Sequence, residues 1–242
     1  MNKVFILTKR NLKEIIRDPL SLVFCLGFPV VMLVLMQFVI GGVADAPANF
    51  QITAYSSGIC VFGYTFSMLF SAMLIAADKN SEFMSRLYMA PIKKSTYLFS
   101  YFLAVLPIMI GQTIIFFALA LCFGLPFSAN ILMAILYLLP SMILYITLGL
   151  FLGTLCRTEK QAGPISSIII SLVGMLGGVF MPVAQMGTID TIANLLPFVH
   201  SVQIGTEALV GNFAGIFPHI LWILGFALIF WIITLIIFKK KK

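Results

Sequence analysis

The sequence predicts an all-α protein that crosses a membrane six times. Of its 242 residues, 61% are hydrophobic and only 10% are charged, whereas a soluble domain carries about 25% charged residues. The apolar residues gather into runs near the length of about 20 residues that a helix needs to cross a hydrocarbon core. Between these runs, polar stretches that contain Lys and Arg alternate with stretches that contain neither.

The positive charges predict the orientation of these helices. All 15 Lys and Arg residues fall in four of the polar stretches, at residues 3–17, 79–94, 157–160 and 239–242. Because cytoplasmic loops carry an excess of Lys and Arg, we expect these four stretches on one side. The chain should therefore be a multi-pass protein of the cytoplasmic membrane, with both termini in the cytoplasm.

Six apolar runs are long enough to cross the membrane. They cover residues 20–42, 53–77, 96–122, 130–156, 164–182 and 216–238. No polar stretch between them is long enough for a soluble domain, so we expect one transmembrane domain over residues 1–242. The short motif Gly149-x-x-x-Gly153 in the fourth run is typical of close helix packing.

Residues 3–18 have the pattern of an amphipathic helix. At 100° per residue one face collects the apolar side chains together with Thr8: Val4, Phe5, Thr8, Leu12, Ile15 and Ile16. Such a helix with a basic second face lies in the membrane interface. The alternative is a basic flank that only orients the first crossing. Asp18-Pro19 should end the helix, because the residue before a proline disfavours the α conformation.

Residues 183–215 are apolar but carry polar and ionisable side chains: Asp190, Asn194, Pro197, His200, Gln203 and Glu207. An Asp at the centre of a crossing helix costs about 2.5–3.5 kcal/mol. A seventh crossing would also place the four terminal lysines outside. We therefore expect an external re-entrant segment that enters the outer leaflet and returns.

Motifs that would indicate catalysis in this chain are absent from its sequence. It contains no G-x-x-x-x-G-K-[ST], no H-E-x-x-H and no G-x-S-x-G, so we expect neither a nucleotide cradle nor a catalytic centre. The four cysteines and two histidines show no zinc-type spacing, and we expect no metal. Two rival functions stay open: a membrane enzyme that modifies lipids or isoprenoids, and a non-transporting membrane anchor.

Three stretches together resemble the type-2 ABC transporter permeases, the membrane subunits of bacterial ATP-driven exporters. The first runs from Leu7-Thr8-Lys9-Arg10 to Arg17-Asp18-Pro19 and leads into a crossing that contains Pro29. The second spans residues 78–91 and keeps Asp78, Arg86-Leu87 and Pro91. The third is residues 176–182 followed by Leu196-Pro197-Phe198. The chain departs from the family pattern at Glu82, Phe83 and Ser85, and at Met186-Gly187, where a second proline is common.

The resemblance implies a function and partners. It implies a permease that exports a hydrophobic or amphiphilic substrate, such as a drug, an antibiotic, a lipid-like molecule or a peptide. It implies two copies of a separate ATPase, which hold ATP and Mg²⁺, and a second permease in a homodimer or heterodimer. This chain would bind no cofactor itself and no nucleic acid.

The resemblance also implies roles for particular residues. The cytoplasmic segment 78–95 would be the helix that couples to the ATPase, through Asp78, Glu82, Arg86, Leu87 and Pro91. The spacing of Asp78, Glu82 and Arg86 places them on one helical face; the alternative is a solvated loop. An external gate would involve Gly178, Pro182, Pro197, His200 and Glu207, although Glu207 could equally be an acid exposed at the outer interface.

A substrate pathway would lie where the second and fifth crossings of two permeases face each other. The second crossing carries a stripe with the spacing i, i+3, i+4, i+7, i+8: Phe62, Thr65, Phe66, Leu69 and Phe70. The fifth crossing offers Ser166, Ile170 and Val173. The alternative for both sets is ordinary packing or contact with lipid.

Overall fold

The computed structural model describes residues 2–41, 51–82, 84, 93–180 and 187–240, and every regular element within them is helical. In chain order these elements are α1 (Asn2–Arg17), α2 (Pro19–Leu22), the π-helix η1 (Val23–Gly27), α3 (Phe28–Gly41), α4 (Ile52–Asp78), α6 (Lys94–Cys122), α7 (Asn130–Tyr137), α8 (Leu139–Leu155), α9 (Glu159–Leu176), α10 (Thr188–Leu195), α11 (Pro197–Val210) and α12 (Phe213–Lys240). The all-α prediction is confirmed for these residues.

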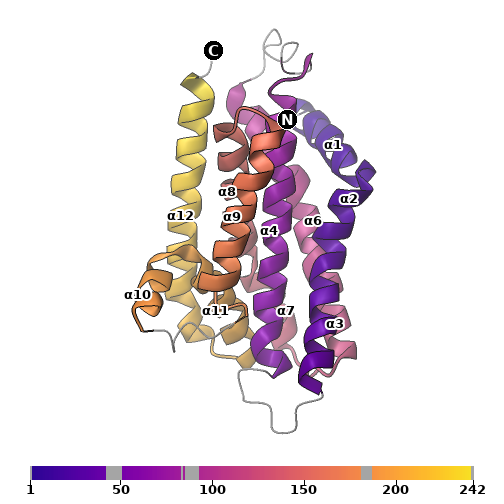
Figure 1. Ribbon diagram of the computed structural model, residues 1–242, viewed down its shortest axis with the longest axis vertical. Coiled ribbons are helices and arrows are strands. Elements are labelled where there is room, and N and C mark those ends of the chain that lie inside the picture. Colours follow the sequence, from indigo (N-terminus) through magenta and orange to yellow (C-terminus); the bar gives the residue numbers. More distant parts are fainter. Residues whose placement is uncertain (1, 42–50, 83, 85–92, 181–186, 241–242) are drawn as a thin grey trace.

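The long helices run up and down a single bundle (Figure 1). The start of α1, the ends of α4 and α8 and the end of α12 lie at one end, which we call the basic end (Figure 1). The described parts of the four basic stretches lie in α1, after α4, at the start of α6, after α8 and at the end of α12. The arrangement follows the predicted alternation of crossings.

Five helical stretches of the described chain are long and apolar enough to cross a membrane: residues 19–39, 52–78, 95–122, 130–155 and 213–238. The predicted fifth crossing, residues 164–182, is not among them. Its helix α9 starts earlier, at Glu159, with a charged and polar first turn, and ends at Leu176. This helix still lies alongside α4 over part of its length (Figure 1), but the count of six crossings stays a prediction.

Asp18 and Pro19 separate α1 from the first crossing. Asp18 caps α2: its carboxylate accepts a hydrogen bond from the backbone N–H of Leu20 at 3.2 Å and another from the Ser21 hydroxyl. Pro19 occupies the first helical position, where its missing N–H is no loss. The chain therefore changes direction between α1 and α2, as the sequence predicts.

Proline also explains the irregular first crossing. The π-helix η1 comes directly before Pro29. In a regular α-helix the proline ring would clash with the carbonyl of Cys25, four residues earlier. One wider turn relieves that clash and keeps the helix continuous into α3.

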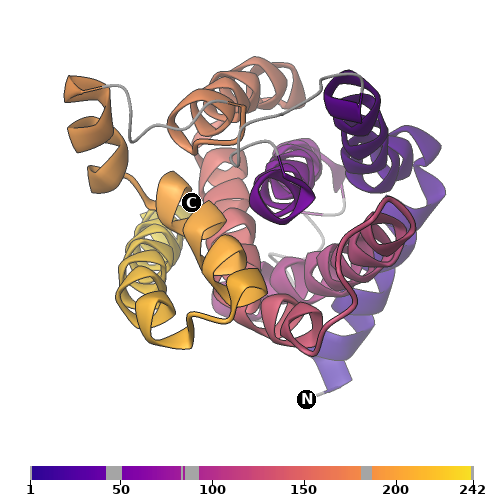
Figure 2. The same ribbon diagram turned by 90° about the horizontal axis from the view of Figure 1, so that it is seen from below.

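Helix α4 lies at the centre of the bundle, encircled by the other long helices (Figure 2). Its fully buried side chains include Ile59, Tyr64, Met68 and Ile75. The packing against α8 is closest at Gly149 and Gly153: a Cβ on Gly153 would lie 2.6 Å from the backbone oxygen of Ala72. The prediction that this glycine motif serves close packing is confirmed.

The segment predicted to be re-entrant contains two short helices, α10 and α11, of 8 and 14 residues. Neither is long enough to cross a membrane. Both lie in the half of the bundle remote from the basic end (Figure 1). Pro197 starts α11 and Gly211, with φ of 88°, ends it in a left-handed cap. The depth of this segment in the membrane stays a prediction.

Candidate functional site

A buried ion pair joins α1 to the basic end of α4. Asp78, the last residue of α4, has a side chain only 5% exposed and accepts two hydrogen bonds from Arg10 of α1, at 2.5 and 2.8 Å. The two bonds run in parallel, which is the strongest geometry available to a guanidinium and a carboxylate. The hydrogen bond to Asp78 raises the pKa of Arg10 above its ordinary value, so Arg10 is always charged.

Helix α6 completes this network. The Tyr101 hydroxyl donates to Asp78, and the hydroxyls of Tyr97 and Tyr101 lie 2.8 Å apart. Next to Arg10 in α1, the buried Asn11 amide donates to Ser100 at 3.1 Å. Three helices that are distant in sequence thus meet in one polar cluster, and a movement of any one would strain the hydrogen bonds of the other two.

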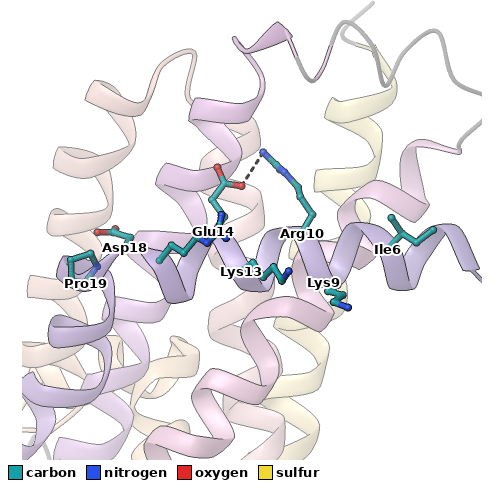
Figure 3. Close-up of a pocket in the computed structure, with 8 residues that line it drawn as sticks. Ile6, Lys9, Arg10, Lys13, Glu14, Asp18 and Pro19 are labelled. Atoms are coloured by element: carbon teal, nitrogen blue, oxygen red, sulfur yellow. Dashed lines mark ion pairs between the residues drawn. The ribbon is translucent and has the colours of Figure 1, made fainter.

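The side of α1 that faces away from the bundle is open and basic, and Arg10 lies at its edge. A hollow of about 810 Å³ runs along it, and Figure 3 shows the side chains that line it. Arg10 and Glu14 pair there at 2.9 Å, while Lys9 and Lys13 project from another part of the helix surface (Figure 3). Burial raises the pKa of Glu14.

The apolar face predicted for α1 is divided in the structure. Of its members, Ile15 is buried and Val4, Thr8 and Leu12 are half-exposed, whereas Phe5 and Ile16 are 72% and 52% exposed. Leu7 and Asn11, which lie outside the predicted face, are buried against the bundle. The exposed apolar side chains adjoin the basic ones on the helical wheel. This is the distribution expected of a helix with one edge in lipid and one at the headgroups.

Lys79 locks the end of α4 to the end of α8. Its ammonium donates to three backbone oxygens at the C-terminus of α8: Gly153 at 3.0 Å, Thr154 at 2.6 Å and Cys156 at 2.5 Å. Carbonyls in the last turn of a helix form the negative end of its dipole, which attracts a positive charge. The sequence predicts for Lys79 only a role in orienting the crossings, and nothing in its spacing points to α8.

We expect Lys79→Met to loosen this junction. Hydrogen bonds to a charged group contribute about 1.5–3 kcal/mol, so the melting temperature of the purified protein should fall by about 4–10 °C for a chain of this length. Lys160→Met, in the exposed first turn of α9, is the matched control. Equal melting temperatures for the two variants would contradict the role of Lys79.

Of the predicted coupling residues, Asp78 and Glu82 do not belong to one continuous helix. Helix α4 ends at Asp78, and turns follow at Lys79, Asn80 and Ser81. Asp78 is buried, while Glu82 is exposed. The other three predicted coupling residues, Arg86, Leu87 and Pro91, lie outside the described residues.

The predicted pathway stripe of α4 is partly covered by its own chain. Phe62 and Thr65 are buried, whereas Phe66, Leu69 and Phe70 are half-exposed. The three phenylalanine rings of the stripe belong to an aromatic cluster. The ring centroids are 4.5 Å apart for Phe28–Phe66 and 5.2 Å apart for Phe62–Phe180. Phe24 lies 5.9 Å from Phe66 and 6.3 Å from Phe70. The half-exposed part of the stripe therefore adjoins the first crossing.

On α9 the structure exposes a different face from the predicted one. Ser166 and Val173 are buried and Ile170 is half-exposed. The exposed face carries four large apolar side chains: Ile165, Ile168, Leu172 and Met175. A helical wheel separates the faces, but it cannot say which of two apolar faces turns toward α4.

The predicted gate residues occupy the ends of α9 and α11. Gly178 follows α9 with φ of 71°, Pro197 begins α11, and Pro182 lies outside the described residues. Glu207, in the last turn of α11, accepts a hydrogen bond at 2.6 Å from Asn212, which follows the helix. His200 meets His219 of α12 with their Nδ1 atoms 2.8 Å apart. Sequence reasoning did not select His219.

The fold and these sites define a polytopic helical membrane domain. A family model described as "ABC-2 type transporter" matches residues 2–213, and the chain belongs to this family. The predicted resemblance to type-2 ABC permeases is thereby confirmed.

A curated relative is consistent with this assignment. ABC transporter G family member 23 of Dictyostelium discoideum is 23% identical over 154 residues, which are 63% of this chain and 22% of the relative. The chain thus spans about a fifth of the length of that relative.

Proposed function

We propose that this chain is the permease subunit of an ABC exporter that moves a hydrophobic or amphiphilic substrate out across the cytoplasmic membrane. The observation that carries this proposal is the family match over residues 2–213. The sequence has no phosphate-binding loop, so ATP hydrolysis would belong to a separate ATPase subunit that binds ATP and Mg²⁺. In this proposal α9 makes the fifth of six crossings and both termini are cytoplasmic.

Coupling to the ATPase would pass through the polar segment 78–95. Asp78 at the start of this segment is bonded to α1 and α6, and Lys79 is bonded to α8. A push on the segment would therefore be shared by several helices at once. Such a connection favours movement of the bundle as a rigid body, which is one of the common ways of switching access.

The substrate would pass between two permease copies, in a homodimer or with a related partner. The half-exposed Phe66 and Phe70 of α4 and the exposed apolar face of α9 are the surfaces that we assign to this contact. They are apolar and aromatic, which suits hydrophobic cargo. Two ATPase copies would dock at the basic end.

The proposal is tested by co-purification with an ATPase and by the dependence of efflux on that ATPase. We expect a neighbouring gene to encode a P-loop ATPase and the two proteins to co-purify. Replacing the phosphate-binding lysine of that ATPase with alanine should abolish efflux from cells or vesicles. Efflux that continues with this variant, at equal expression, would contradict an ATP-driven permease.

We expect the double variant Glu82→Gln/Arg86→Gln to uncouple transport. Loss of a coupling free energy of about 1–3 kcal/mol lowers substrate-stimulated ATPase activity and export by about 5- to 100-fold. The matched control is Glu159→Gln/Lys160→Gln, which removes one acid and one base from the other short cytoplasmic turn. If recruitment of the ATPase and export both persist unchanged in the first variant, segment 78–95 is not the coupling element.

A further inference from the structure

The chain has only two histidines, and they meet across two helices. His200 lies on α11 and His219 on α12, near the start of the last crossing. Their Nδ1 atoms are 2.8 Å apart, and the ring centres are 5.0 Å apart with an angle of 32° between the planes. Both side chains are half-exposed, so small ions can reach them.

The hydrogen bonds of His200 define its tautomer. Its Nε2 lies 3.0 Å from the backbone oxygen of Asn194, which can only accept, so Nε2 carries the proton. A neutral imidazole then has a lone pair on Nδ1, and His219 must donate its Nδ1–H to it.

These features are those of a histidine prepared to bind a metal. Metal-ligating histidines commonly donate their second ring N–H to a backbone carbonyl, which fixes the ring and leaves a lone pair for the metal. His200 already has this arrangement with Asn194. The single hydrogen between the two Nδ1 atoms occupies the position that a cation could take.

A third potential ligand lies one turn along α11. The side-chain oxygen of Gln203 is buried and has no hydrogen-bond partner among the described residues. The side chain of Gln203 lies next to that of His200. A buried acceptor without a donor costs about 1–3 kcal/mol, and a bound cation would satisfy it. The neighbouring acid, Glu207, is already bonded to Asn212 and is not required.

We propose that His200, His219 and Gln203 form a binding site for a divalent transition-metal ion, with Zn²⁺ as the best match. Imidazole nitrogen is a preferred zinc ligand, and tetrahedral bonds of about 2.0–2.1 Å hold two nitrogens about 3.3 Å apart. The two Nδ1 atoms must therefore separate by about 0.5 Å, which ring rotation can supply. His219 loses its Nδ1 proton and takes one on Nε2, and water completes the coordination.

The sequence alone gave no reason to expect this site. The two histidines are 19 residues apart, far outside the short spacings that mark zinc motifs. Only the packing of α11 on α12 joins them. A bound ion would tie the external helix α11 to the last crossing, whatever substrate the protein carries.

Direct metal binding tests the proposal without any transport assay. The full chain is purified without a histidine tag in a Cys122→Ser background, because Cys122 is an exposed thiol that could bind zinc by itself. Titration calorimetry should show one Zn²⁺ per chain. Pulsed electron paramagnetic resonance with Cu²⁺ as the probe should show two imidazole ligands, which only these two residues can supply.

The Zn²⁺ affinities of variants and the pH dependence of binding then identify the ligands. His200→Asn and His219→Asn should each weaken Zn²⁺ binding at least about tenfold. Gln203→Leu should weaken it less, and so should Glu207→Gln, which removes a negative charge that acts on His219. Binding should also weaken as the pH falls, because protons compete for the imidazoles. Absence of Zn²⁺ binding to the unaltered histidines, or fewer than two imidazoles on Cu²⁺, would overturn the proposal even if a variant failed to fold.

Discussion

Replacing Arg10 with methionine is expected to leave the buried carboxylate of Asp78 without its counter-ion and to destabilise the protein strongly. Removing one partner of a buried pair costs about 3–5 kcal/mol, and about 2–4 kcal/mol is reasonable here because the Arg10 side chain is 32% exposed. The melting temperature should fall by about 5–15 °C for a chain of this length. The same variant should lower export, since α1 would no longer be fixed to α4.

A second substitution distinguishes the lost pair from lost packing. Asp78→Asn removes the charge but keeps an oxygen that can accept from Tyr101. The double variant Arg10→Met/Asp78→Asn should therefore be more stable than Arg10→Met alone. Lys13→Met, on the exposed side of the same helix, should change the melting temperature by little. If Arg10→Met is as stable as Lys13→Met, the pair does not hold α1 in place.

Adding side chains at Gly149 and Gly153 is expected to separate α8 from the central helix. A Cβ on Gly149 would lie 2.2 Å from Ser71 Oγ and 2.7 Å from the Met68 backbone oxygen, and one on Gly153 would lie 2.6 Å from the Ala72 oxygen. Backbone atoms cannot move aside as a flexible side chain can. Overpacking costs about 1–3 kcal/mol per site, so Gly149→Ala/Gly153→Ala should greatly reduce the yield of monodisperse protein.

A glycine without close neighbours provides the matched control. Nothing lies within 4 Å of a Cβ built on Gly225 of α12, so Gly225→Ala should be neutral or slightly stabilising, by up to about 1 kcal/mol. Fluorescence-detected size-exclusion chromatography and thermal melting measure both variants. Similar behaviour of Gly149→Ala/Gly153→Ala and Gly225→Ala would show that α8 and α4 can tolerate a wider separation.

Much of the fold follows from one-dimensional patterns. The Asp18-Pro19 break between α1 and the first crossing was predictable because proline constrains the residue before it. The length and position of α4, α6 and α12 followed from apolar runs, since a crossing helix must bury about 20 consecutive residues in lipid. The short glycine motif in α8 predicted close packing because only small residues let two backbones approach.

The candidate sites were less predictable, because they depend on which face of each helix turns inward. Ser166 and Val173 were assigned to an open pathway, but α9 turns them toward α4 and exposes Ile168 and Leu172 instead. Nearly every face of these helices is apolar, so amphipathicity, which orients helices in soluble proteins, carries little information here. The partners of Asp78 and Lys79 lie far away in sequence, so no local pattern predicts these contacts.

The sequence by itself determined the helical class, the likeness to type-2 ABC permeases and the alternation of basic stretches. Each of these depends on composition and order along the chain. Only the tertiary structure decided that Asp78 pairs with Arg10, that Lys79 holds the end of α8 and that His200 meets His219. Such contacts join residues on different helices, and helix rotation and crossing are set by packing, which no local pattern records.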